Sequence, residues 1–148
     1  MRRPTQLDTL TTVAERQEAA TARALGDCRA RLDAKTGRLE QLENYYLEYT
    51  RTLSPAPGQQ LTPALLASHG AFLAQLRNVI DDETGAHSKL CDELAHHQVH
   101  YGAARAHTQG LKKLGERREH ASMLKDLRQE QSVSDELAAR ARSRIWRA

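Results

Sequence analysis

A row of apolar residues at alternating steps of three and four limits what this chain can fold into. The row runs from Leu25 to Leu53, and only Lys35 interrupts it. Its other members are Cys28, Leu32, Leu39, Leu42, Tyr46 and Tyr49. On an α-helix this spacing forms one narrow apolar stripe, which has to be buried against a partner helix. Because the rest of the helix surface is charged, the stripe predicts an extended coiled coil rather than a compact globule.

The sequence has one strong break in its helical pattern. The segment 54–60 holds two prolines and a glycine, which end a helix, and Thr62-Pro63 is typical of a new helix start. We therefore predict an all-α fold, a long antiparallel two-helix coiled-coil hairpin that forms a single domain over residues 1–148. Helix 1 is expected over about 5–53, the loop over 54–62 and helix 2 over about 63–144.

The second helix carries a matching row in steps of three and four, with polar residues at several positions. Its members are Phe72, Leu76, Ile80, Glu83, His87, Leu90, Leu94, His97, Tyr101, Ala104, Thr108 and Leu111. Counted back from the loop, Leu53 is expected opposite Pro63, and Leu7 opposite about residue 109. Residues after about 112 then have no partner in helix 1, and we expect them to overhang as the end of a longer second helix.

The start of the first helix is predicted from its capping residues and its apolar row. Thr5 as N-cap with Asp8 three residues later indicates a capping box. Leu7, Leu10 and Ala14 begin the row, which reaches Leu25 only with one extra four-residue step. Such a step is a stutter, and it predicts a locally unwound supercoil.

Positive charge is concentrated in the last third of the chain. Residues 105–148 carry 11 Lys and Arg against 6 Asp and Glu, whereas residues 1–104 carry 11 against 13. The basic side chains that we single out as a candidate contact are Arg117, Arg118, Arg140, Arg142 and Arg144. These side chains are either an ordinary solvent-exposed surface or an electrostatic binding site for an acidic partner or a nucleic acid.

Aromatic residues gather on both sides of the predicted loop. Leu42, Tyr45 and Tyr49 form a second stripe, rotated slightly from the first, and Phe72 and Leu76 lie nearly opposite on the second helix. An apolar and aromatic patch on the side of a rod is a candidate docking surface. The spacing alone is equally compatible with plain packing between the helices.

The sequence gives no support for catalysis. It has no Gly-rich phosphate loop, no nucleophile beside a base and no paired carboxylates, and a two-helix hairpin has no concave pocket. His96 and His100 have a metal-clamping spacing, but no third ligand is evident, so we expect no metal and no cofactor. Cys28 and Cys91 do not form a disulfide framework, which favours a reducing cytoplasm. No apolar run is long enough to cross a bilayer.

Three stretches resemble the flagellar export family FliJ. They are Gln41-Leu42-Glu43-Asn44-Tyr45-Tyr46-Leu47-Glu48-Tyr49, Phe72-Leu73-Ala74-Gln75-Leu76 and Leu111-Lys112-Lys113-Leu114-Gly115-Glu116-Arg117-Arg118. The resemblance covers nearly the whole chain. It implies a cytoplasmic, non-catalytic component of the flagellar type III export apparatus, similar to the coiled-coil stalk of the rotary ATP synthase and attached to the membrane only through its partners.

The resemblance also implies partners and a site. The termini of the chain would lie in the pore of the hexameric export ATPase FliI, and its loop end would contact the export gate protein FlhA. The chain would also escort export chaperones. No nucleic acid is expected as a partner. The gate-binding patch, carried over, is Leu42, Tyr45, Tyr49, Phe72 and Leu76, and we assign the basic end to the ATPase. Arg38, Val79 and Glu83 depart from the family pattern at the edges of the patch.

Besides a metal carrier that uses its histidines, two other functions remain as alternatives. One is the equivalent stalk protein of a virulence type III secretion system, which the sequence separates poorly from a flagellar one. The other is a nucleic-acid-binding coiled coil that uses the basic C-terminal tail, for which binding should weaken steeply with added salt.

Overall fold

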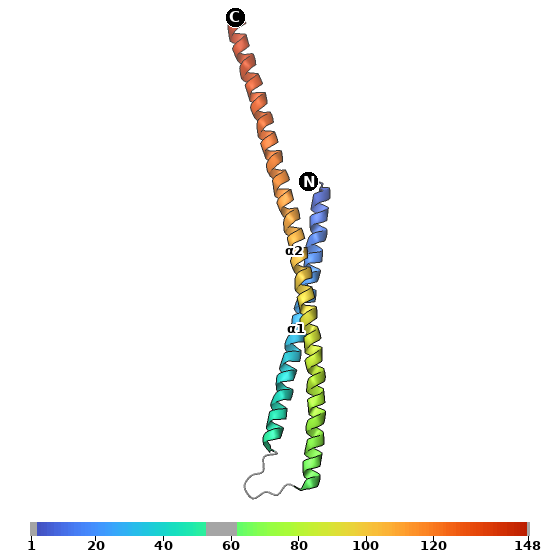
Figure 1. Cartoon of the computed structure of the whole chain (residues 1–148). Helices are drawn as coiled ribbons and strands as arrows, with labels where there is room; N and C mark the ends of the chain where they lie inside the picture. Colours follow the sequence, from blue (N-terminus) through green and yellow to red (C-terminus); the bar gives the residue numbers. More distant parts are fainter. Residues whose placement is uncertain (1–2, 53–61, 148) are drawn as a thin grey trace. The chain divides into compact units, whose positions relative to one another are not determined.

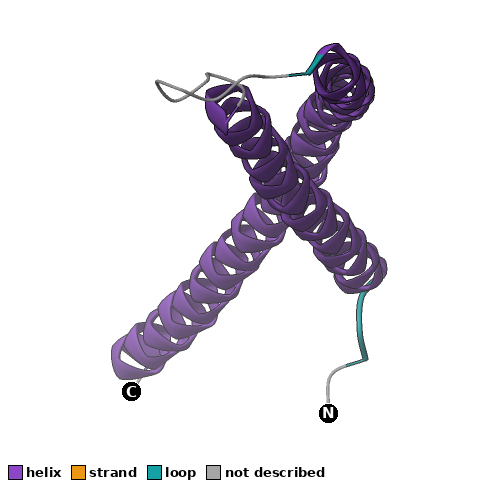
Figure 2. Ribbon diagram, turned by 90° about the horizontal axis from the view of Figure 1, so that it is seen from below, coloured by secondary structure: helices purple, strands orange, loops and turns teal. Residues whose placement is uncertain are grey.

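The computed structural model describes residues 3–52 and 62–147. These residues form two helices, α1 (Gln6–Thr52) and α2 (Pro63–Arg147), shown in Figure 1. Figure 2 shows helix and short stretches of loop, and no strand occurs in the described ranges. The all-α fold with a longer second helix is confirmed, and α2 ends three residues beyond the predicted residue 144. Leu53 and the predicted loop residues 54–61 lie outside the described part.

Both helices begin at the predicted capping residues. The backbone N–H of Thr5 donates to Asp8 Oδ2 at 2.9 Å, and the N–H of Asp8 donates to Thr5 Oγ1 at 3.2 Å. This reciprocal pair is the predicted capping box, which satisfies N–H groups that have no partner within the helix. At α2, Thr62 Oγ1 accepts the N–H of Leu65 at 3.3 Å, and Pro63 is the first helical residue.

The contacts divide the chain into two compact units. The first comprises residues 1–18 and 104–148, and the second comprises residues 19–103. In the second unit, Arg31 pairs with Glu93 while Tyr49, later in α1, packs on Phe72, earlier in α2. Opposite directions of α1 and α2 follow from this order. The first unit has the same antiparallel order, and whether both units act as the single predicted domain stays a prediction.

The first unit places the beginning of α1 against the middle of α2. Glu15 Oε1 lies 3.3 Å from Lys112 Nζ, and the Leu7 side chain reaches Gly115, where an added Cβ would lie 3.7 Å from Leu7 Cδ2. Leu7 is predicted opposite residue 109 but faces Leu111 and Gly115 of α2, so the register differs from the prediction by two to six residues. The first unpaired part of α2 accordingly begins at Glu116 rather than at about residue 112.

The seam of α1, defined as its buried and half-buried positions in steps of four and three, runs without interruption. Its members are Leu7, Thr11, Ala14, Glu18, Thr21, Leu25, Cys28, Leu32, Lys35, Leu39, Leu42, Tyr46 and Tyr49. The prediction of Leu10 as a member was wrong, because Leu10 is 52% exposed and Thr11 takes its place. With Thr11 in the row the extra four-residue step disappears, so the predicted stutter was wrong too.

The seam of α2 agrees with the prediction from Leu76 to Leu111 and differs near the start of the helix. His69 and Leu73 are half-buried, whereas Phe72 is 45% exposed, so the row passes through His69 and Leu73. The residues before His69, including Leu65 and Leu66, are exposed. Tyr49 contacts His69 and Lys35 contacts Glu83, and each partner lies two residues beyond the position that a count from Leu53 and Pro63 gives, so the pairing in the second unit is shifted from the prediction.

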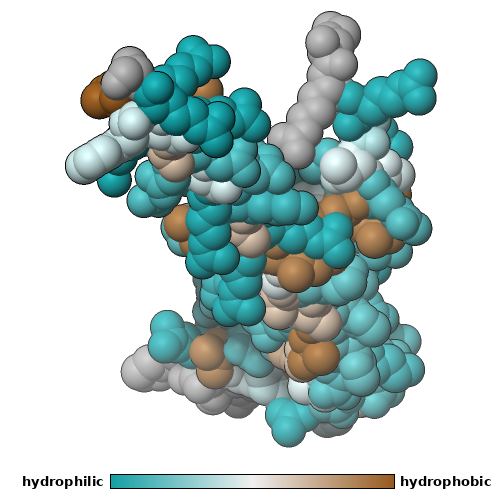
Figure 3. Space-filling view, turned by 90° about the horizontal axis from the view of Figure 1, so that it is seen from above, coloured by the Kyte–Doolittle hydropathy of each residue, from teal (hydrophilic) through white to brown (hydrophobic). Residues whose placement is uncertain are grey.

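The core of each unit is thin. Among the described residues only Ala14, Leu25, Cys28 and Thr108 are buried, and three of these four have small side chains. Thr108 is tolerated there because its hydroxyl donates to the carbonyl of Ala104 at 3.0 Å. Two helices bury only facing stripes, so many apolar side chains stay exposed among polar ones, and Figure 3 shows hydrophobic residues in separate patches on the visible face.

Candidate interaction sites

The predicted gate-binding residues, which we call the aromatic patch, gather at the end of the second unit where α1 ends and α2 begins. Tyr49 packs on Phe72 with ring centroids 4.5 Å apart and on His69 with centroids 5.2 Å apart. Leu42, Tyr49 and Leu76 are half-buried in the seam. These three side chains therefore hold the helices together, and whether they also bind a partner stays a prediction.

Two members of the aromatic patch are accessible. Tyr45 is 66% exposed and Phe72 keeps nearly half of its surface in solvent. Tyr45 lines a shallow hollow of about 540 Å³ on α1, together with Ala34, Gly37, Arg38, Gln41 and Leu42. An exposed ring beside a shallow hollow can dock a partner side chain without unfolding the helix pair. The structure thus divides the predicted patch into a packing part and an accessible part.

The predicted basic end lies entirely in the first unit, and its side chains do not converge. Arg117, Arg118, Arg140, Arg142 and Arg144 are all exposed. Arg118 and Arg140 are separated by about 33 Å along a straight helix, at 1.5 Å per residue. These residues form two basic groups rather than one site. Their assignment to ATPase binding stays a prediction.

The seam of the second unit contains a polar layer whose contacts the sequence did not predict. It comprises Lys35, Thr36 and Arg38 of α1 and Glu83 and His87 of α2. Lys35 Nζ lies 2.8 Å from Glu83 Oε2, and Arg38 Nε lies 3.7 Å from Glu83 Oε1. The hydrogen bond and charge of Lys35, with the charge of Arg38, lower the pKa of Glu83 below its ordinary value, against a smaller opposing effect of burial.

The second contact of the polar layer joins Thr36 and His87. Thr36 Oγ1 donates to the carbonyl of Leu32 at 2.9 Å and lies 3.0 Å from His87 Nε2. Since the hydroxyl proton is used on Leu32, His87 Nε2 is the donor to Thr36 Oγ1. In the sequence, Lys35 interrupts the apolar row of α1, and Glu83 and His87 are polar positions in the row of α2. Only the register shows that Lys35 contacts Glu83 and that Thr36 contacts His87.

His87 also lies near an exposed thiol. Its Nδ1 is 3.8 Å from Cys91 Sγ, one helical turn away. With Nε2 bonded to Thr36, Nδ1 is the acceptor for the Cys91 S–H. The pair lies on an open helix surface without a surrounding cleft, so it lacks the water-excluding enclosure that nucleophilic catalysis uses. Both cysteines of the chain are free.

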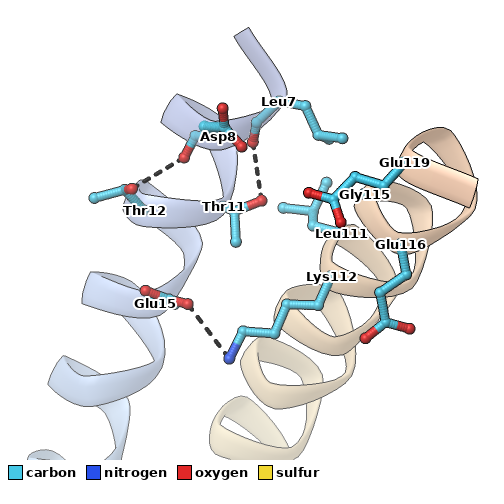
Figure 4. A pocket seen from close by; sticks show the side chains of 10 residues that line it. All are labelled: Leu7, Asp8, Thr11, Thr12, Glu15, Leu111, Lys112, Gly115, Glu116 and Glu119. Carbon is cyan, nitrogen blue, oxygen red and sulfur yellow. Dashed lines mark hydrogen bonds and ion pairs between the residues drawn. The ribbon is translucent and has the colours of Figure 1, made fainter. Parts of the chain in front are cut away.

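An acidic groove between α1 and α2 was also missed. It lies in the first unit, has a volume of about 390 Å³ and is lined by Leu7, Asp8, Thr11, Thr12, Glu15, Leu111, Lys112, Gly115, Glu116 and Glu119. Figure 4 shows Leu7, Leu111 and the Glu119 carboxylate pointing into the space between the helices. Lys112 pairs with Glu15, which leaves the groove with a negative balance. The register decides its position, so the row pattern alone gave no signal for it.

The histidines of α2 do not build a metal centre in the described part of the chain. His96 and His100 are exposed and His97 is half-buried in the seam. No group of three or more His, Cys, Asp or Glu side chains among the described residues is placed to hold a metal ion. None of the described helices has the length and apolar character required to cross a membrane.

Comparison with known proteins gives one match that spans almost the whole chain. The family model described as flagellar FliJ protein matches residues 2–145. No curated protein and no solved structure shows significant similarity to the chain.

Proposed function

We propose, because this chain belongs to the flagellar FliJ family, that it is a helical stalk linking the export ATPase to the export gate. The family is a non-catalytic component of flagellar protein export, and the chain is such a component. The finer proposal is that α2 binds the hexameric ATPase FliI, that the aromatic patch binds the gate protein FlhA, and that the helices escort export chaperones. The protein would then lie in the cytoplasm, held at the inner face of the membrane by its partners.

The observation that carries the ATPase contact is the exposed end of α2 in the first unit. We call residues 116–147 the C-terminal extension, and every one of them is exposed. An extended helix of 32 residues is about 48 Å long, and its last turns carry Arg140, Arg142, Arg144 and Arg147. A long, single, basic helix is a suitable shape and charge for a narrow acidic channel.

Accessible aromatic side chains in the second unit support the gate contact. Tyr45 and Phe72 are large, exposed and attached to packed helices, so little conformational entropy is lost when a partner covers them. Aromatic residues of this kind dominate the energy of many protein interfaces. The half-buried Leu42, Tyr49 and Leu76 would act by holding this surface in place.

The ATPase contact is tested by adding the purified chain to the flagellar export ATPase. We expect binding and a higher rate of ATP hydrolysis. The variant with Arg140, Arg142 and Arg144 all changed to Ser should lose most of the stimulation, because it removes the basic end while leaving the helix pair intact. A matched control changes three exposed basic residues of the second unit, Arg23, Arg29 and Lys89, to Ser. Absence of binding and stimulation by the wild-type chain would reject the proposal.

The gate contact is tested by comparing two exposed side chains of α1. Tyr45→Ala should weaken binding to the gate protein about tenfold, as removal of an exposed interface aromatic commonly does. Leu47→Ala is the control, since Leu47 is 53% exposed on the same helix but points away from Tyr45. Equal binding by the Tyr45 variant and the wild type would remove the aromatic patch from the interface. Circular dichroism should show unchanged helicity in both variants.

A further inference from the structure

The C-terminal extension carries an apolar stripe that α1 does not cover. Leu124, Leu127 and Ile145 are 43%, 58% and 75% exposed. They belong to a row in steps of four and three that is distinct from the seam. Its members are His120, Leu124, Leu127, Gln131, Ser134, Ala138, Ala141 and Ile145. The row spans about 38 Å of helix and nearly four heptads, which is long enough for a two-stranded coiled coil.

Charges beside this stripe are separated by sign along the helix. On one flank, the first half carries Glu119, Asp126 and Glu130. The charged side chains in the second half of the same flank are all basic, at Arg140, Arg144 and Arg147. Such a flank is complementary to itself when two copies are laid in opposite directions. Laid in the same direction, Glu130 of one copy would lie beside Asp135 of the other copy, and these like charges would repel.

The sizes of the stripe residues also favour an antiparallel pair. In an antiparallel pair, positions at equal distance from a midpoint between Ser132 and Val133 face each other. Leu124 then faces Ala141 of the other copy and Leu127 faces Ala138, so large side chains meet small ones. His120 faces Ile145, and Gln131 faces Ser134 at the centre. On the flank at the other side of the stripe, Arg128 of one copy lies beside Asp135 of the other copy.

We propose that the C-terminal extension binds a second copy of this chain as an antiparallel two-stranded coiled coil centred between Ser132 and Val133. The apolar stripe supplies the core, and the two halves of the flank supply the complementary charge. Polar residues at the centre of the stripe make this a reversible association rather than an obligate dimer. The inference concerns the extension alone and does not depend on the proposed function.

Self-association would have a consequence for ATPase binding. It places Arg142 and Arg144, two of the arginines that we assign to the ATPase, beside the second copy, so the paired extension and the ATPase-bound extension exclude each other. The dimer would be a storage form of the free protein. The association constant then decides how much monomer is available at a given concentration.

The test is sedimentation of the full chain from about 1 to 200 µM, a range that resolves micromolar association. We expect a monomer–dimer equilibrium that weakens with added salt, because the flank charges are screened. Leu127→Asp and Ile145→Asp should each raise the dissociation constant at least about tenfold, since a carboxylate would be buried in the core. Ser122→Asp and Ser143→Asp add the same charge to the opposite side of the same helix and should leave it unchanged.

Orientation is tested by cysteine cross-linking in a chain that carries Cys91→Ser. Leu127→Cys combined with Ala138→Cys should give a covalent dimer on oxidation, because the two positions face each other in the antiparallel pair. Ala141→Cys alone should give none, since the two thiols would lie about 26 Å apart. A covalent dimer through residue 141 would indicate a parallel pair and overturn the proposal.

Two further results would also overturn it. One is a monomer throughout the concentration range, even if the Leu127 variant loses ATPase binding, since the stripe would then serve the ATPase instead. The other is a dimer that Leu127→Asp and Ile145→Asp do not weaken, since the contact would then lie elsewhere on the chain.

Discussion

Lys35 and Glu83 occupy seam positions in which most coiled coils place apolar residues. Their 2.8 Å contact satisfies both charges, but a slip of one heptad would leave each of them half-buried against an apolar side chain. The contact between Thr36 and His87 adds a second condition on the same register. Polar groups at single seam positions are a known means of fixing alignment at some expense of stability. The polar layer is therefore the residue-level feature that selects one alignment of α1 and α2.

The polar layer predicts a pH dependence that can be assigned to Glu83. Its folded-state pKa is lowered from the ordinary value of 4.5, so its contribution to stability is complete above that value and is lost as the pH falls through the lowered one. Glu83→Gln should lower the melting temperature at pH 7, and its difference from wild type should shrink at pH 3. Glu40→Gln, on the exposed surface of α1, is the control. A difference for Glu83→Gln that is the same at both pH values would contradict the assignment.

At the scale of the elements, the sequence predicted both helices and nearly all of their seams. The alternation of three and four over many heptads is a redundant signal, and the capping residues Thr5 and Thr62 mark the helix starts independently. The prediction failed where the larger apolar residue was preferred to the regular step. Leu10 was chosen over Thr11, and Phe72 was chosen over Leu73. In a thin two-helix core, the regular alternation of three- and four-residue steps decides which position is buried, even where the neighbouring position carries a larger apolar side chain.

The candidate sites were less predictable than the helices because they depend on how α1 and α2 align. Lys35, Glu83 and His87 were visible in the sequence as polar seam residues, but their contacts follow only from the register. The register in turn depends on where pairing begins, and the exposed first turn of α2 gave no sign of this. The predicted aromatic patch combined half-buried Tyr49 with exposed Tyr45 because heptad spacing does not distinguish a seam position from its immediate flank.

A pair of leucines in α1 tests the corrected seam. Leu25→Ala should lower the free energy of unfolding by about 2 to 3 kcal/mol, because Leu25 is buried against α2. Leu10→Ala should change it by less than about 0.5 kcal/mol, since Leu10 is mostly exposed. Urea unfolding followed by circular dichroism measures both values on the same helix. Equal losses for the two variants would support the stutter and place Leu10 in the seam.

At the scale of the whole molecule, stability and the proposed ATPase contact are assigned to different parts of the chain. The buried residues, the polar layer and the ring contacts of Tyr49 all lie before Glu116, whereas the residues of the C-terminal extension are all exposed. Deleting residues 119–148 should therefore leave the melting temperature within about 2 °C of wild type, because little apolar surface is uncovered. The same deletion should abolish both stimulation of the ATPase and self-association. Thermal unfolding, ATPase assays and sedimentation on one preparation measure the three properties together.

The deletion separates the extension from the aromatic patch as well. Binding to the export gate protein should persist in the shortened chain, because Tyr45 and Phe72 lie in the second unit and keep their packed neighbours. Tyr45→Ala gives the reverse pattern, with gate binding weakened and ATPase stimulation retained. Two variants with opposite defects would establish that each partner uses its own part of the chain. Loss of gate binding in a shortened chain that melts normally would contradict this, because it would make the extension part of the gate contact.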